Sequence, residues 1–329
     1  MTINRICIIG PGAIGGMMAV KLANAGFEVS ALVRPHRVDG MNKNGLTLLD
    51  EGQTFHAVPN ASAQSETLGP QDLVVITVKE NNLKDVAPNI GLLVGNGTQV
   101  VQVTNGIPWW FFLNFGGSLE GTRLSSVDKD NCVSDYFSLS RHIGGVINCG
   151  VSVRDDGVLV HDHSNQLYLG RPSNDSAGVE EVAAVFQAAG YKSSVAASIH
   201  QQVMTKLLAN ISFNPLSALT MGTLDLMLND ELVAEALIGL MNEGRSVTKA
   251  MGLDPGPDPA ERVSGASRIS PSKTSMLQDM EHGKPLELDG ILASTIEVAG
   301  LLDVPVPMTK TVYGLLRVRE QVALGQGAQ

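Results

Sequence analysis

Three polar residues follow one another at helical spacing near the middle of the chain. Lys206, Asn210 and Asn214 are spaced i, i+4 and i+8 within MTKLLANISFNPLSALT, so a helix stacks them on one face among leucine and isoleucine side chains. Such a line of polar residues either faces solvent or lines a cleft. Asparagine is a mediocre helix former, and Pro215 is expected to interrupt the helix just after Asn214. Residues that weaken the helix in this way are better explained by a pocket that they line than by an ordinary solvent-exposed helix face.

A lysine in such a pocket is suited to proton donation. Partial desolvation lowers the pKa of a lysine, which makes its ammonium group a usable acid toward a carbonyl oxygen that becomes an alkoxide. Hydride arriving from a nicotinamide creates that alkoxide. In this hypothesis Lys206 protonates the oxygen, and the amides of Asn210 and Asn214 bind substrate hydroxyls or a carboxylate. The substrate itself cannot be identified from these residues.

A glycine-rich turn near the N-terminus matches the cofactor that this chemistry needs. Gly10-Pro11-Gly12-Ala13-Ile14-Gly15 has the GxGxxG pattern, directly after an apolar run at 5–9 and before an expected helix at 15–25. The first glycine permits a tight turn, the second lets the backbone approach a pyrophosphate, and the third allows close packing of helix on strand. The order of strand, turn, helix and strand favours a dinucleotide-binding site over a merely structural glycine turn.

The second expected strand, 28–34, ends on a cation. An NAD site usually places Asp or Glu there to bind the ribose hydroxyls, whereas this chain has Arg34. A guanidinium matches a 2′-phosphate in charge and geometry, so the sequence predicts NADPH/NADP⁺ in preference to NAD(H). His36 and Arg37 are further candidates for this contact, with solvated loop residues as the alternative, and Asp39 lies too far past the strand.

The elements that must position these residues fall into two blocks. Strands and helices alternate through the first block, which predicts an α/β fold with a doubly wound sheet, and the pattern is helical from about Ser198 onward. We therefore expect a dinucleotide-binding domain at 1–196 and a helical substrate domain at 197–329. The expected strands are 5–9, 28–34, 72–79 and 98–104, with hairpins at 45–58 and 143–163 and helices near 82–93, 199–220, 230–251, 271–282, 287–301 and 307–324.

Composition excludes several classes of protein. With 43% hydrophobic and 17% charged residues the chain is not intrinsically disordered, and its net charge of −10 argues against nucleic-acid or anionic-membrane partners. No uninterrupted apolar stretch approaches the ~20 residues that span a bilayer. Three cysteines without a CxxC pair favour a reducing, cytoplasmic location. No metal site is suggested, since a hydrogen-bonded or solvated pair is favoured over a metal-binding pair for His161 and His163.

An aromatic segment breaks the regular pattern after Gly106. Trp109–Phe112 lie in an expected loop that runs to His142. Large aromatic side chains in a loop either cap a pocket, bury a subunit contact or pack on their own domain, and the sequence does not choose among these. A homodimer is one partner arrangement that this segment leaves open.

Several longer motifs resemble the ketopantoate reductase (2-dehydropantoate 2-reductase) family. They occur in order and cover nearly the whole chain, and the last two are long and specific. The matching pieces are GPGAIG at 10–15, Arg34, ITVKE with Lys79, TNG with Asn105, KLLANISFNPLSAL from Lys206, and TSMLQDMEHGKPLELDG at 274–290.

The resemblance implies a fold and a reaction. The fold is a Rossmann-type domain followed by an all-helical C-terminal domain like that of 6-phosphogluconate dehydrogenase. The implied reaction is NADPH-dependent reduction of a 2-oxo acid, with 2-dehydropantoate to (R)-pantoate, in pantothenate biosynthesis, as the best single candidate. In it, hydride passes from nicotinamide C4 to the C2 carbonyl and Lys206 is the general acid.

The resemblance also implies roles for the remaining site residues. Glu287 completes the active site beside Lys206 and contacts the cofactor. Asn105 lies between nicotinamide ribose and substrate. The other implied contacts are Asn210, Asn214 and Ser275 to substrate, and Gly10, Pro11, Gly12, Ala13, Ile14, Gly15, Arg34 and Lys79 to cofactor.

Two departures from the family pattern concern the substrate. The segment from Asn105 to His142 is longer than expected, and Thr223-Leu224 stands where some members carry a further substrate-binding asparagine. Two alternatives therefore stay open. One is a D-2-hydroxy acid dehydrogenase of the same superfamily acting on a bulkier 2-oxo acid, and the other is a non-catalytic NADP-binding sensor.

Overall fold

The chain forms two compact units, each considered by itself. The computed structural model describes residues 3–266 and 271–325, without the side chains of 264–266. Two short stretches that follow strand β7 (Val94–Val103) group with the helical C-terminal part of the chain. The first unit comprises Met1–Thr104, Trp110–Arg123 and Asp130–Gln202, and the second comprises Asn105–Trp109, Leu124–Lys129 and Val203–Gln329.

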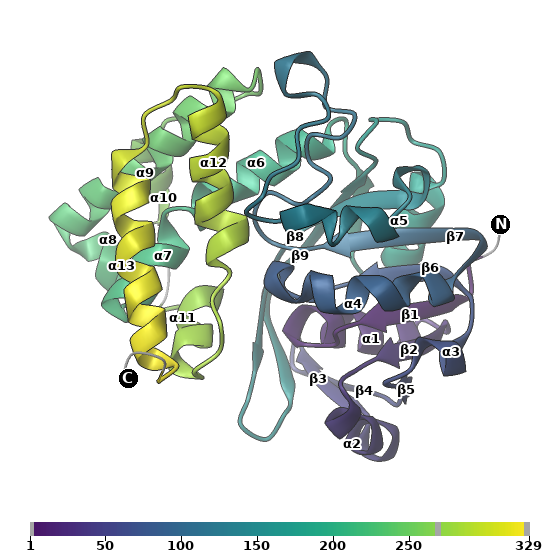
Figure 1. Cartoon of the computed structure of the whole chain (residues 1–329). Coiled ribbons are helices and arrows are strands. Elements are labelled where there is room, and N and C mark those ends of the chain that lie inside the picture. The colour runs from purple at the N-terminus through teal and green to yellow at the C-terminus, as the bar shows by residue number, and fades with distance from the viewer. Residues whose placement is uncertain (1–2, 267–270, 326–329) are drawn as a thin grey trace. The chain divides into compact units, whose positions relative to one another are not determined.

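The first unit is built on a ten-stranded sheet (Figure 1). Its strands are β1 (Arg5–Ile9), β2 (Glu28–Leu32), β3 (Leu46–Asp50), β4 (Gln53–Ala57), β5 (Asn60–Ser62), β6 (Gln71–Ile76), β7, β8 (His142–Val153), β9 (Leu159–Gly170) and β10 (Lys192–Val195). The parallel part has the order β5-β2-β1-β6-β7-β8, which is the doubly wound Rossmann order. The strand order reverses between β1 and β6, where ligands of such sheets bind. Beyond β8 the sheet continues through β9 and β3 to β4.

Helix α1 (Ala13–Asn24) fills the inside of this sheet. It packs against β1 and β2 and also against β3, β4, β8 and β9, so the sheet curls around it. Met17, Met18, Val20 and Leu22 of the helix are completely buried. This burial on several sides explains why α1 has apolar residues all round rather than on one face.

The other helices of the first unit are short. The predicted hairpins at 45–58 and 143–163 and the predicted helix near 82–93 are confirmed, whereas β5, β10 and three of the α-helices were not predicted. The helical elements are η1 (Pro35–Arg37), α2 (Val38–Asn44), α3 (Ser65–Leu68), η2 (Glu80–Asn82), α4 (Leu83–Ile90), η3 (Gly91–Leu93), η4 (Gly117–Leu119), η5 (Lys129–Asn131), η6 (Ser134–Tyr136), η7 (Leu139–Arg141) and α5 (Val179–Ala188).

The aromatic segment packs within its own chain. Trp110, Phe111 and Phe112 are at most 1% exposed, so they are not available for a subunit contact. The Trp110 ring lies against two buried histidines, with centroids 5.7 Å from His142 and 5.9 Å from His200. Of the three interpretations that the sequence left open, packing on the chain's own domain is the one that holds for these side chains.

The described part of the second unit is predominantly helical, as predicted. Its elements are α6 (Ile199–Asn210, from Val203 onward), α7 (Phe213–Thr220), α8 (Leu224–Asn229), α9 (Glu231–Ala250), α10 (Pro259–Ala266), α11 (Ser275–Glu281), the π-helical turn η8 (Asp289–Ala293), α12 (Ser294–Leu301) and α13 (Pro307–Ala323). The long helix α9 packs against α8, α10, α12 and α13 (Figure 1). Among the described residues, no helix combines the length and the apolar character needed to cross a membrane.

The predicted continuous helix near 199–220 is wrong. The chain leaves the helix at Ile211 and Ser212 and re-enters it as α7, so the break lies before Asn214 and not after it. Pro215 explains the position of the break, because it has no N–H to donate to the carbonyl of Ile211 and its ring excludes a helical turn there. In the first turn of α7 the same proline is tolerated, since first-turn N–H groups have no helical partner.

Candidate active site

The glycine-rich turn lies where the ends of three strands meet. It joins β1 to α1, and the Gly10 N–H donates to the carbonyl oxygen of Leu32 at the end of β2, at 3.2 Å. From the end of β6, the Thr77 hydroxyl donates to the carbonyl oxygens of Ile9 and Gly10 at 3.1 and 2.9 Å. Thr77 was not among the predicted site residues. The sequence feature that could have identified it is a hydroxyl side chain directly after an apolar strand.

The local geometry fits the diphosphate of a dinucleotide. Gly10 has φ +79°, and a Cβ there would overlap the Val78 side chain. At Gly15 a Cβ would overlap Thr77, whereas at Gly12 the nearest atom would lie 3.9 Å away. The middle glycine therefore leaves its backbone open to a ligand. No side chain caps the N-terminus of α1 and its first turn has no acidic residue, so the helix N-terminus can face an anion.

Three cations follow the strands around this turn. Arg34 comes after β2 with an exposed side chain, and Lys79 follows β6, half-buried, at the start of η2. Arg37 is tied to the turn itself, because its Nη1 donates to the carbonyl oxygen of Pro11 at 3.2 Å. Of the two loop residues weighed beside Arg34, the structure thus brings Arg37, in the third position of η1, to the glycine-rich turn.

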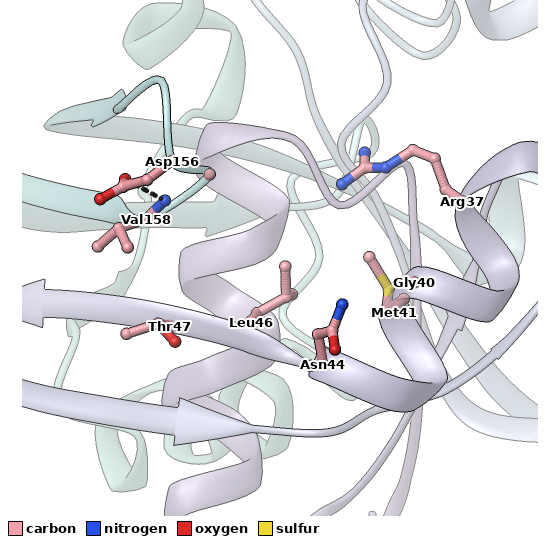
Figure 2. A pocket seen from close by; sticks show the side chains of 10 residues that line it. Arg37, Gly40, Met41, Asn44, Leu46, Thr47, Asp156 and Val158 are labelled. Atoms are coloured by element: carbon pink, nitrogen blue, oxygen red, sulfur yellow. Dashed lines mark hydrogen bonds between the residues drawn. The ribbon is translucent and has the colours of Figure 1, made fainter.

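A cavity of about 410 Å³ adjoins this region (Figure 2). It lies between α2, the start of β3 and the turn from β8 to β9, with Arg37 and Asp156 among its lining residues. Asp156 is paired with Arg154 at 2.9 Å on the surface. Among its lining residues, Arg37 is the one that we considered as a cofactor contact, and none of the predicted substrate-binding residues lines it.

In the second unit, the polar stripe is withdrawn from solvent. Lys206 and Asn210 are half-buried on α6, and Asn214, the second residue of α7, is 7% exposed. The Nδ2 atom of Asn210 is buried without a hydrogen-bond partner among the described residues. A buried amide donor of this kind is costly unless a ligand accepts from it. The stripe is therefore not the wet face of an ordinary amphipathic helix.

Two motifs that are far apart in the sequence meet in the second unit. The Asn105 amide Nδ2 donates to Glu287 Oε2 at 3.0 Å across a separation of 182 residues. Glu287 is only 9% exposed, although from its residue type alone it passes for a surface glutamate. The π-helical turn η8 begins two residues later, and such turns occur often at functional sites.

Ser275 lies at the start of a neighbouring helix. It is the first residue of α11 and is exposed, while Thr274 caps that helix by accepting the Leu277 N–H at 3.2 Å. Helix α11 packs against α7, which carries Asn214. Each predicted site residue thus has a defined place, with Asn105, Lys206, Asn210, Asn214, Ser275 and Glu287 in the second unit and the glycine-rich turn, Arg34 and Lys79 in the first.

His161, one of the two strand histidines, has close polar neighbours in the first unit. His161 Nδ1 lies 2.5 Å from Asp50 Oδ1, and its Nε2 lies 2.6 Å from the carbonyl oxygen of Ser164. Within the described residues there is no group of three His, Cys, Asp or Glu side chains that could hold a metal ion. His161 therefore belongs to the core of the first unit.

Comparisons with known proteins identify the family of this chain. Residues 6–174 match the family model for ketopantoate reductase PanE/ApbA, and residues 198–320 match the model for its C-terminal part. The chain belongs to the ketopantoate reductase family. It is accordingly an oxidoreductase of the 2-dehydropantoate 2-reductase type, with a small-molecule substrate and a nicotinamide cofactor.

Individual relatives cover almost the whole chain. A 2-dehydropantoate 2-reductase from Mesorhizobium japonicum is 36% identical over 315 residues, which are 95% of this chain and 97% of that protein. The crystal structure of a putative ketopantoate reductase from Ralstonia solanacearum has a TM-score of 0.92 at 33% identity, covering 97% and 98% of the two chains. A D-mandelate dehydrogenase, solved with NADH and anilino(oxo)acetate, shares the fold with a TM-score of 0.83 at 18% identity, covering 97% and 99%.

Proposed function

We propose that this chain reduces a 2-oxo acid with NADPH, and that 2-dehydropantoate is its substrate. The observation that carries the proposal is the hydrogen bond from Asn105 to Glu287, because it joins two family motifs into one polar pair in the unit that contains Lys206. NADPH supplies the hydride. The product, (R)-pantoate, is a precursor for pantothenate biosynthesis.

In this proposal each candidate site residue of the second unit has a role in the reaction. Lys206 donates a proton to the substrate oxygen as negative charge develops there. The Glu287 carboxylate favours the charged form of the lysine and orients it, and Asn105 holds that carboxylate at 3.0 Å. Asn210 and Asn214 donate amide hydrogen bonds to the substrate, and Ser275 binds its carboxylate. The buried, unsatisfied Nδ2 of Asn210 supports this assignment.

A substrate panel tests this proposal. NADPH oxidation is measured with 2-dehydropantoate, pyruvate, 2-oxoisovalerate and phenylglyoxylate. Selective turnover of 2-dehydropantoate is expected. Preference for phenylglyoxylate would replace the substrate and favour a D-2-hydroxy acid dehydrogenase. Tight NADPH binding without turnover of any of the four would leave a non-catalytic NADP-binding sensor as the better description.

The cofactor preference depends on the arginines after β2. In this proposal Arg34 and Arg37 bind the 2′-phosphate, and Lys79 contacts the cofactor from the end of β6. Arg34→Gln is expected to lower kcat/KM for NADPH by about 10- to 100-fold while kcat/KM for NADH stays nearly constant, because a charge-assisted hydrogen bond to phosphate is lost. Arg37→Gln is expected to have a smaller effect, since part of its guanidinium is engaged with Pro11.

The NADH rate is the control for both variants. If Arg34→Gln lowered kcat/KM for the two cofactors equally, the arginine would not read the 2′-phosphate and the NADP preference would be wrong. A loss of thermal stability in step with activity would identify a structural effect, so the melting temperature is recorded for each variant.

We also propose a homodimer that pairs through the outer face of α13. Leu315, Val318 and Val322 are 52%, 61% and 69% exposed, and they form one apolar stripe along that helix. Two antiparallel copies of the stripe place Leu315 of one chain opposite Val318 of the other. Gly314 and Gln321 on one side of the stripe are uncharged, and Arg319 lies on the other side; in this register Arg319 of one chain lies opposite Gly314 of the other rather than opposite its own copy.

Sedimentation velocity tests this assembly. A dimer of the wild-type chain that Val318→Lys converts to monomer is the expected result. Leu232→Lys is the matched control, because Leu232 is 76% exposed on α9. A monomeric wild type, or equal dissociation by both variants, would exclude the α13 interface.

A further inference from the structure

The segment that carries Asn105 is attached to the turn after Glu287 at two points. One is the side-chain hydrogen bond from Asn105 to Glu287 at 3.0 Å. The other is a backbone hydrogen bond, in which the Ile107 N–H donates to the carbonyl oxygen of Gly290 at 2.8 Å. Gly106 lies between the two attachment points. The two backbones therefore run against each other at this glycine.

Gly106 can only be a glycine in this arrangement. Its φ of +84° is in the region that L-residues rarely adopt. A Cβ at this position would lie 2.9 Å from Gly290 Cα and would overlap the Gly290 carbonyl group. Any side chain must therefore push segment 105–107 away from the turn that follows Glu287.

The π-helical turn provides the acceptor for this contact. Gly290 is the second residue of η8, where π-type hydrogen bonding replaces the regular α-helical pattern. Its carbonyl oxygen accepts from Ile107 N and also from the Ser294 hydroxyl at 2.6 Å. One residue further along, Thr295 Oγ1 donates to the carbonyl oxygen of Ile291 at 2.7 Å. This second bond is of the same kind, but it holds a carbonyl other than the one that accepts from Ile107.

We infer that Gly106 and the Gly290 carbonyl are a positioning device that sets the Asn105 amide against Glu287. This inference rests on the proposed function, in which Asn105 and Glu287 belong to the active site. The two glycines touch neither substrate nor cofactor in this account, so they act on the chemical step through Asn105. A shift of about 1 Å in a group that aligns reacting atoms lowers the rate by about 100-fold.

The first test compares two glycines with the same backbone angle. Gly106 and Gly116 both have φ +84°, but a Cβ at Gly116 would meet no atom within 4 Å. Gly106→Ala is expected to lower kcat by about 100-fold, with the Kd for NADPH within about threefold of wild type. Gly116→Ala also places a side chain at φ +84° and is expected to keep kcat within about threefold. Equal kcat values for the two variants would overturn the inference.

The second test adds no atoms, so it remains decisive if Gly106→Ala does not fold. Ser294→Ala removes a hydroxyl that holds the Gly290 carbonyl, and Thr295→Val removes the neighbouring hydroxyl that holds Ile291. Both side chains are completely buried. We expect Ser294→Ala to lower kcat several-fold more than Thr295→Val does at similar loss of thermal stability. Equal kcat values would contradict the positioning role.

A spectroscopic measurement separates this inference from the proposed function. In the amide NMR spectrum, the Asn105 side-chain NH₂ resonances should move toward free-amide positions in Gly106→Ala and stay in place in Gly116→Ala. If the wild-type chain oxidised NADPH with none of the 2-oxo acids, the proposed function would fail, yet this spectrum would still decide the positioning role. Unmoved Asn105 resonances in a folded Gly106→Ala protein would refute it.

Discussion

Asp50 and Glu287 are both almost completely buried, and their neighbours differ in kind. Asp50 is 8% exposed and Glu287 is 9% exposed. Asp50 lies 2.5 Å from the Lys21 ammonium nitrogen and 2.5 Å from His161 Nδ1, which brings residues of α1 and β9 onto β3. Glu287 instead accepts a hydrogen bond from the neutral amide of Asn105.

The comparison shows that burial alone does not mark a functional carboxylate. The Asp50 group ties a helix to two strands of the curled sheet, and its charge is compensated by a lysine in the core. The Glu287 group joins two motifs that carry candidate site residues. We therefore expect the loss of charge at Asp50 to appear in stability and the loss of charge at Glu287 to appear in catalysis.

The largest effect is expected from Glu287→Gln. The substitution keeps the size of the side chain and an oxygen that can accept from Asn105, but it removes the charge that we propose orients Lys206. kcat should fall by about 1,000-fold, within the usual range for loss of acid–base function. Steady-state NADPH oxidation measures the loss of catalysis, and thermal unfolding measures any loss of stability. A kcat within about threefold of wild type would remove Glu287 from the active site.

Asp50→Asn is expected to lower stability rather than catalysis. The change leaves the Lys21 ammonium buried without its carboxylate, so the free energy of unfolding should fall by about 3 kcal/mol. Burial by itself raises the pKa of Asp50, but hydrogen bonds from Lys21 and His161 outweigh this and hold it below its usual value. The stabilisation by Asp50 is therefore present above pH ~4 and is lost as pH falls through the lowered pKa.

Denaturant unfolding at several pH values checks this prediction, with kcat of the folded variant as its control. The difference between wild type and Asp50→Asn should shrink in acid, because the protonated aspartic acid is also neutral. A variant with unchanged stability and strongly reduced kcat would reverse the assignment of the two carboxylates.

A smaller effect, on the pH dependence of stability, is expected from buried histidines. Unlike His161, two other buried histidines lie among aromatic rings, and burial lowers the pKa of His200 to about 4 and that of His142 to about 3. The unfolded chain then binds more protons below pH ~6.5, so stability falls as pH decreases from there toward the folded pKa values. Each histidine contributes up to ~1.4 kcal/mol per pH unit to this slope.

His200→Phe tests the histidine contribution directly. It should reduce the acid slope of the unfolding free energy by about one proton, which linkage analysis of unfolding between pH ~4 and ~6.5 measures. An unchanged slope would mean that His200 is already accessible to protons in the folded chain. His200 is 2% exposed, and its ring lies 5.0 Å from that of Phe111, so the phenylalanine fits the aromatic surroundings.

Local signals predicted one part of the site and not the other. The GxGxxG turn is contiguous, and its glycines, strand and helix are adjacent in sequence, so its geometry follows from short-range sterics. The pairing of Asn105 with Glu287 depends on backbones that meet across 182 residues, and only the family resemblance assigned both residues to the active site. From its own residue type Glu287 is indistinguishable from a surface glutamate.

The errors in the predicted fold have similar causes. Pro215 was correctly associated with a helix break, but its steric effect falls on the preceding turn, so the break is at Ile211–Ser212. Strand β5 has only three residues and β10 has four, which is too short for a periodic pattern to be recognised. The packing of the aromatic segment depends on His142 and His200, which lie far along the chain. A domain boundary near Ala196 and a cytoplasmic location stay predictions.

The central claim is that Lys206 is the proton donor in the reduction of a 2-oxo acid, and its most direct test is the rate of NADPH oxidation with 2-dehydropantoate by wild type and Lys206→Ala. We expect wild-type turnover and a fall in kcat of at least about 1,000-fold in the variant, with NADPH binding, followed by nicotinamide fluorescence, retained. Equal kcat values in the two proteins would contradict the account.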